Sequence, residues 1–165
     1  MGRLSDMRTI KQLLEGAERE ARSMGEEEPG AEHLLLSALL LRDGEALRLL
    51  SDFGVDHARL QSAIVAQHSE ALVGLGMDRE RAEGLAAPRP LEPPHGRGLF
   101  RSRVSAQEAF RTAASLAQRD RRSGLNGAHV VAAVAAMEHG TAARALEGLG
   151  VDRAALAAAA HAAIG

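Results

Sequence analysis

Apolar residues recur at three- and four-residue steps through the first part of the chain, which places them on one face of a helix. This face comprises Met7, Ile10, Leu13, Leu14, Ala17, Ala21 and Met24. We expect Ser5 or Asp6 to cap the helix and Gly25 to end it. After Pro29-Gly30, residues 31–42 predict a second helix. Because it is apolar on nearly every side, we expect it to be buried in the middle of a helical bundle.

Two shorter helices are expected to follow. One begins after Asp43-Gly44 and stops at Gly54, and the other is capped by Asp56. Four helices in the first 73 residues therefore form one structural unit.

This unit occurs twice, because residues 10–60 align without a gap with residues 106–156 at an offset of 96. The identical positions that define the repeat motif include His33 and His129, Gly44 and Gly140, and Gly54 and Gly150. We predict an all-α fold of two pseudo-twofold-related four-helix repeats, with a binding surface at the seam between them. The two histidines start equivalent buried helices, which favours structural hydrogen bonds to the backbone at the turn.

The predicted organisation is repeat 1 over residues 1–73, a connecting segment over residues 74–103 and repeat 2 over residues 104–165. The connecting segment includes a short helix near Met77–Leu85 and then a proline- and glycine-rich linker. Four prolines within residues 88–94 favour an extended chain. Repeat 2 has the smaller apolar side chains, so we expect it to be the less stable half.

Composition and charge exclude several classes of function. The net charge is −2 with both signs interspersed, which argues against a nucleic-acid binder. No apolar run is long enough for a membrane span and no signal peptide is evident, so we expect a cytoplasmic protein. The chain has no cysteine, no H-E-x-x-H motif and no glycine loop before its single lysine, Lys11. We therefore expect no metal site, no cofactor and no enzymatic activity.

Three motifs, in the same order in both halves, resemble a known family. Repeat 1 contains Gly30-Ala31-Glu32-His33-Leu34-Leu35-Leu36, then Arg42-Asp43-Gly44-Glu45-Ala46, then Leu50-Ser51-Asp52-Phe53-Gly54-Val55-Asp56. Repeat 2 contains His129-Val130-Val131, Gly140-Thr141-Ala142-Ala143-Arg144-Ala145-Leu146 and Leu149-Gly150-Val151-Asp152. This pattern is similar to the Clp N-terminal (Clp R) double repeat of Clp-type AAA+ unfoldases, here without the ATPase modules.

The resemblance implies a domain that receives Clp unfoldase partners, adaptors or substrate proteins and, in some members, phosphorylated arginine. In those members the glutamate before the repeat histidine recognises the arginine-phosphate group. Repeat 1 retains this residue as Glu32, and a carboxylate can pair with a guanidinium through two parallel hydrogen bonds. Repeat 2 has Ala128 at the matching position. The alternative for Glu32 is that it only complements the positive end of the second helix.

Three functions remain open. The leading hypothesis is a non-catalytic protein- or peptide-binding module that acts as an adaptor, substrate receptor or decoy in Clp-dependent proteolysis. A second is sequestration of Clp-targeting cyclic-peptide antibiotics at a surface formed by Arg3, Met7, Leu99 and Phe100. In that surface Phe100 is either a binding anchor or a plug that packs the linker onto the bundle. The third is a degenerate structural or dimerisation domain.

Overall fold

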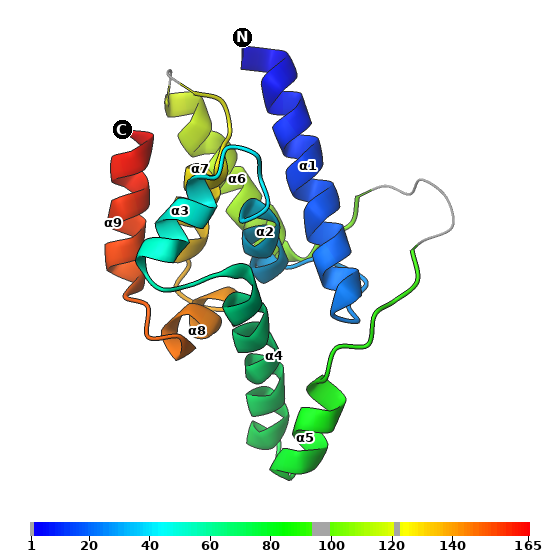
Figure 1. Ribbon diagram of the computed structural model, residues 1–165. Coiled ribbons are helices and arrows are strands. Elements are labelled where there is room, and N and C mark those ends of the chain that lie inside the picture. Colours follow the sequence, from blue (N-terminus) through cyan, green and yellow to red (C-terminus); the bar gives the residue numbers. More distant parts are fainter. Residues whose placement is uncertain (1, 94–99, 121–122) are drawn as a thin grey trace.

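The computed structural model describes residues 2–93, 100–120 and 123–165, and this part of the chain forms nine helices and no strand. The helices are α1 (Gly2–Ser23), α2 (Ala31–Ala38), α3 (Glu45–Asp52), α4 (His57–Gly74), α5 (Arg79–Ala86), α6 (Val104–Arg119), α7 (Gly127–Ala135), α8 (Thr141–Gly148) and α9 (Arg153–Ile164). Figure 1 shows them in one bundle, with both ends of the chain at the same end of the molecule. The predicted all-α fold is confirmed.

The duplication seen in the sequence is also present in the helix boundaries. Helices α2, α3 and α4 each begin 96 residues before α7, α8 and α9, and α1 ends 96 residues before α6. The motif glycines Gly44, Gly54, Gly140 and Gly150 all have positive φ angles, a conformation that other residues rarely adopt. The four-helix repeat thus recurs, although the turn before α3 differs from the turn before α8, since ψ is 3° at Gly44 and 177° at Gly140.

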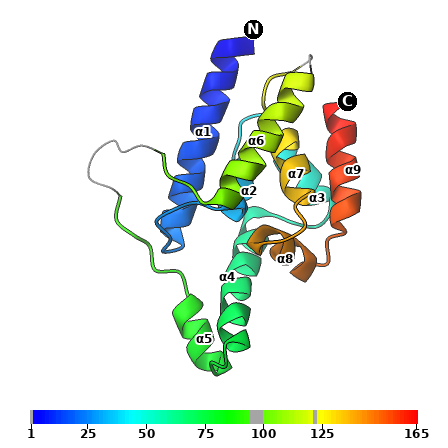
Figure 2. The same ribbon diagram turned by 180° about the vertical axis from the view of Figure 1, so that it is seen from behind.

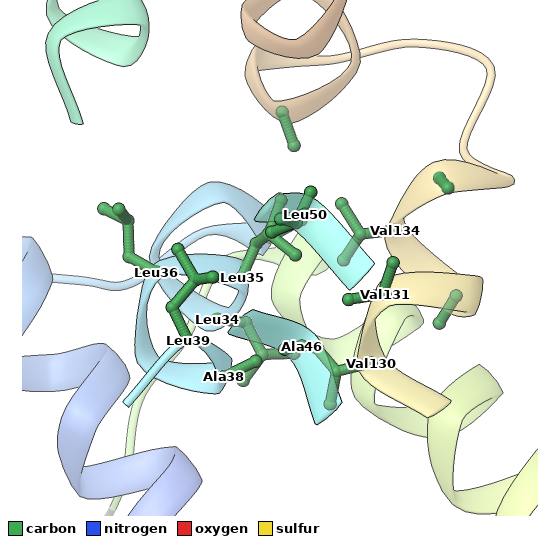
Figure 3. Packing of buried hydrophobic residues seen from close by; sticks show 14 of the residues in the cluster. Leu34, Leu35, Leu36, Ala38, Leu39, Ala46, Leu50, Val130, Val131 and Val134 are labelled. Carbon is green, nitrogen blue, oxygen red and sulfur yellow. The ribbon is translucent and has the colours of Figure 1, made fainter. Parts of the chain in front are cut away.

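The two repeats pack against each other around a central pair of helices, α2 and α7. Helix α3 of repeat 1 packs on α7, and α8 of repeat 2 packs on α2. Every residue of α2 and α7 is buried, as the apolar pattern predicted. Figure 3 shows Leu34 and Leu35 of α2 converging with Leu50 of α3 and with Val130, Val131 and Val134 of α7. The repeats therefore share one hydrophobic core.

Two predicted helix boundaries were wrong. The second helix ends at Ala38 instead of continuing to residue 42, because the chain tightens into three-residue hydrogen bonds from Leu40 N–H to Ser37 O and from Leu41 N–H to Ala38 O. Helix α1 already begins at Gly2, so Ser5 and Asp6 lie inside it and do not cap it. By contrast, Asp56 caps α4 as predicted, accepting a hydrogen bond from Arg59 N–H at 2.8 Å.

Helices α4 and α5 form a hairpin that extends away from the rest of the bundle (Figure 1). After it, residues 87–93 of the linker run extended, and Leu91 N–H donates to Arg22 O near the end of α1 at 2.9 Å. The Arg22 guanidinium donates in turn to Glu92 O at 2.7 Å. Among the described residues, none of the helices has the length and apolar character that crossing a membrane requires.

Candidate functional site: a cleft between α1 and α6

A cleft of about 590 Å³ lies where the two repeats meet. Its walls come from α1, α2, α6 and the end of the linker, and we call it the α1–α6 cleft. Its lining residues are Leu14, Leu34, Phe100, Ser102, Ala106, Gln107, Phe110, Arg111, Ala114, Ser115 and Gln118. In Figure 2 the two main walls, α1 and α6, are seen next to each other, with the linker entering at the lower end of α6. Pockets of this size are typical of ligand sites.

The periodicity of α6 divides the cleft into an apolar and a polar part. Ala106, Phe110 and Ala114 are four residues apart and share one face of the helix. On the neighbouring face lie the two glutamines, Arg111 and Ser115, whose side chains offer hydrogen-bond donors and acceptors. Buried Leu34 contributes from α2 and half-buried Leu14 from α1. The cleft thus combines an apolar base with a polar edge.

Arg111 is the only charged residue among those that line the cleft. Its side chain is exposed, and no acidic group in the described part of the chain forms a salt bridge with it. Other arginines are paired within the protein, such as Arg79 with Glu70 at 2.6 Å and Arg48 with Glu45 at 2.8 Å. The lining of the cleft therefore carries one positive charge beside its apolar groups.

Glu32, the predicted ligand contact, lies outside this cleft. Its carboxylate already pairs with another side chain of the protein, Arg103. Its carboxylate is 3% exposed, and the Arg103 guanidinium lies 3.4 Å from its Oε1. The same guanidinium forms a second, close ion pair with Glu26. Burial raises the pKa of Glu32 above its usual value, the nearby Glu26 acts in the same direction, and Arg103 opposes both. A ligand guanidinium could reach Glu32 only by displacing Arg103.

The two motif histidines have equivalent roles at the starts of α2 and α7. His33 Nδ1 accepts a hydrogen bond from Gly30 N–H at 2.9 Å, and His129 Nδ1 accepts one from Asn126 N–H at 3.2 Å. Their Nε2 atoms face carboxylates, Glu26 at 3.6 Å and Asp120 at 3.5 Å. Burial lowers the pKa of His129, and burial together with the positive charges of Arg103 and His68 lowers the pKa of His33 to about 3. Both rings are therefore neutral near pH 7.

One group of side chains has the composition of a metal site. Glu26, Glu32 and His33 each offer a ligand atom within 4.8 Å of the others. However, because His33 Nδ1 accepts the Gly30 N–H, the proton of the neutral ring is on Nε2, which then has no lone pair for a metal ion. The Arg103 guanidinium already supplies the positive charge between the two carboxylates. This donor set does not fit a metal ion.

The structure brings together only part of the surface predicted from the sequence. Phe100 lines the cleft and is 39% exposed. Met7 lies on α1 with 67% of its surface exposed but is not among the lining residues. Arg3 belongs to α1, and Leu99 lies outside the described residues. Sequence reasoning missed Phe110 and Arg111. The four-residue spacing of Phe110 with two alanines was visible, but it equally indicates a core face.

Comparisons with known proteins agree with this architecture. Residues 7–83 match the family model of the Clp repeat (R) N-terminal domain. The N-terminal domain of the caseinolytic protease-associated chaperone ClpD from Arabidopsis thaliana has a similar crystal structure. It is 19% identical, with a TM-score of 0.62, and the match covers 99% of this chain and 94% of that one. A structure from work on a malarial protein secretion system is 16% identical, with a TM-score of 0.60 and coverages of 95% and 92%. No curated protein matches the chain.

The order and packing of the helices define a helical double-repeat domain with a Clp N-domain-like fold. Residues 7–83 are similar to the Clp repeat N-terminal domain family, and the whole chain has a Clp N-domain-like fold. In known proteins this domain is a non-catalytic module, and its family binds substrates and adaptors in general.

Proposed function

We propose that this protein is a non-catalytic module that binds segments of other proteins at the α1–α6 cleft, as an adaptor, substrate receptor or decoy in Clp-dependent proteolysis. The observation that carries the proposal is the cleft itself, an apolar depression of about 590 Å³ at the seam between the repeats. The family's general ability to bind substrates and adaptors supports it.

The chemistry of the cleft favours one kind of segment. The apolar base suits leucine-sized side chains, and the glutamine and serine side chains at its edge can bond a peptide backbone. Unpaired Arg111 adds a positive charge that no acidic residue in the described part of the chain neutralises by a salt bridge. The preferred ligand is therefore an apolar segment that carries an acidic side chain.

Fluorescence anisotropy with two labelled peptides tests this preference. One peptide combines leucines with glutamates, and its twin replaces the glutamates with lysines. We expect the acidic peptide to bind about tenfold more tightly, the equivalent of about 1.4 kcal/mol. Arg111→Glu should reverse the preference, because the charge at the edge of the cleft changes sign.

The matched control is Arg119→Glu, which makes the same charge change on α6 outside the cleft lining. It should leave the preference for the acidic peptide in place. A preference that changes equally in both variants would show a nonspecific charge effect and would contradict the proposal. The role in proteolysis is tested with a purified Clp unfoldase and its adaptors, where the absence of binding at micromolar concentrations would count against it.

A second candidate function is sequestration of Clp-targeting cyclic peptides, and the position of Phe100 favours it. Its ring lines the cleft and provides an aromatic surface for an apolar macrocycle. Titration calorimetry with such a peptide measures the affinity directly. A dissociation constant weaker than about 100 μM, near −5.5 kcal/mol, is too weak for protection and would rule this function out. If the protein binds neither class of peptide, the remaining hypothesis is a structural or dimerisation domain.

A further inference from the structure

Phe100 and Ser102 form one rim of the α1–α6 cleft, and Arg103 follows them directly in the chain. Arg103 is the N-cap residue of α6, and its backbone N–H donates to Pro29 O at 2.9 Å. Ser102 O accepts a further hydrogen bond from Gln107 Nε2 at 2.9 Å. The rim is therefore attached to repeat 1 at the turn that leads into α2.

The strongest part of this attachment is the side chain of Arg103. Its guanidinium contacts Glu26 and Glu32, whose side chains are 13% and 3% exposed. We call these three residues the Arg103 clasp. Charge-assisted bonds to a guanidinium are about twice as strong as neutral ones, and removing one partner leaves a buried charge unpaired. The clasp also links the start of α6 to repeat 1, because Arg103 is the N-cap residue of α6, Glu26 precedes α2 and Glu32 lies in its first turn.

Phe100 lies only three residues from the clasp, so at most about 11 Å of extended chain separates them. We propose that the Arg103 clasp positions the Phe100 rim of the cleft. Loss of the clasp lets the rim move outward, widens the cleft and weakens ligand binding, although neither Glu26 nor Glu32 lines the cleft. Arg103 is thus a positioning residue. The effect on binding rests on the function proposed above, whereas the position of the rim does not.

The chain contains no tryptophan and no tyrosine, so a single Phe100→Trp substitution places a unique fluorophore on the rim. In this background we compare Arg103→Gln and Glu26→Gln with the parent. The matched control is Arg101→Gln, which removes an exposed arginine two residues away that forms no ion pair with the described residues. Emission wavelength and acrylamide quenching report how far the introduced indole is exposed, without any ligand.

We expect red-shifted emission and stronger quenching in both clasp variants and no change in the control. The affinity for the leucine–glutamate peptide should fall about fivefold in the clasp variants, because an ordered contact must then be formed on binding. Circular dichroism verifies that each variant is folded. If Arg103→Gln does not fold, Arg103→Lys, which keeps the charge but lacks the planar fork, should give a smaller shift in the same direction.

Unchanged tryptophan emission and quenching in the folded clasp variants would overturn the proposal, whatever the peptides do. Equal changes in the control would overturn it as well, since the effect would then not depend on the clasp. If the tryptophan signal shifts as expected but no variant binds either peptide, the clasp stands and the proposed function fails.

Discussion

The close contact between α3 and α7 predicts that a larger residue in place of Gly127, the first residue of α7, destabilises the fold. A Cβ atom at this position would lie 2.6 Å from Ala46 N and 2.9 Å from Ala46 Cβ. Favourable contacts between non-bonded carbon atoms are about 3.5–4.0 Å, so the overlap is about 1 Å. Because one of the obstructing atoms belongs to the backbone, it cannot move aside as a flexible side chain could. Gly127→Ala must therefore push α3 and α7 apart.

The cost has two parts. Overpacking of a well-packed core costs about 1–3 kcal/mol. Separation of the helices also weakens the hydrogen bonds from Gly127 N–H to the Asp43 carboxylate, whose two oxygens lie 3.2 Å away, and bonds to charged groups contribute about 1.5–3 kcal/mol. We expect a loss of about 3 kcal/mol in the free energy of unfolding. In a domain of this size that lowers Tm by roughly 6–12 °C.

Urea and thermal unfolding followed by far-ultraviolet circular dichroism measure this loss. Gly84→Ala is the matched control, because it makes the same change in α5 where nothing lies within 4 Å of the added Cβ. Replacing a helical glycine there should raise stability by about 0.5–1 kcal/mol. The two substitutions should thus change the free energy of unfolding in opposite directions. If Gly127→Ala unfolds within about 0.5 kcal/mol of the parent, a difference typical of surface substitutions, the close approach of α3 and α7 is wrong.

Three further predictions concern acid, helix packing and the core. Because burial and positive neighbours lower the pKa of His33 to about 3, the unfolded chain binds more protons than the native one below pH 6.5. His33 alone should therefore lower the free energy of unfolding by about 2 kcal/mol between pH 6.5 and pH 5. The lowered pKa of His129 adds to this loss. The raised pKa of Glu32 opposes it, because the native state then binds the extra proton. Urea unfolding that shows a constant or rising free energy of unfolding as the pH falls through this range would contradict this prediction. Glu32→Gln should make the decline steeper, because it removes the carboxyl group that opposes it. A Cβ on Gly16 would overlap the Ser37 hydroxyl, which donates to Leu13 O at 2.7 Å, so Gly16→Ala should cost about 1–3 kcal/mol. Adding Ser37→Ala should recover part of that cost, whereas additive losses in the double-mutant cycle would argue against the contact. Leu50 is fully buried in α3, so Leu50→Ala should lower the free energy of unfolding by about 2–5 kcal/mol. Leu47 lies on the same helix but is 45% exposed, so Leu47→Ala should cost far less. Similar losses for the two variants in denaturant unfolding would show that the buried face of α3 is misassigned.

Much of the fold follows from local signals in the sequence. The offset of 96 predicted the duplication, and the nearly continuous apolar character of residues 31–42 predicted a buried central helix, which the structure has over residues 31–38. Asp56 caps α4, and Gly54 and Gly150 end their turns with positive φ angles. These signals are reliable because capping, glycine turns and helix periodicity depend on residues within a few positions of one another.

The candidate site could be predicted only in part, because its residues are distant in the sequence. Phe100 was identified, but its partners Leu14 and Phe110 looked like ordinary core positions until the helices were placed. Glu32 was expected to meet a ligand, and the structure pairs it with Arg103, which is 71 residues away. Nothing in the local pattern around Glu32 indicates that partner.

The sequence by itself determined the class of fold, the repeat and the placement of most turns. Only the tertiary structure decided which faces are left open as a cleft and which carboxylates are already paired. The physical reason is range: a helix or a cap forms from neighbours along the chain, whereas a cleft or a buried ion pair exists only where packing brings distant segments together.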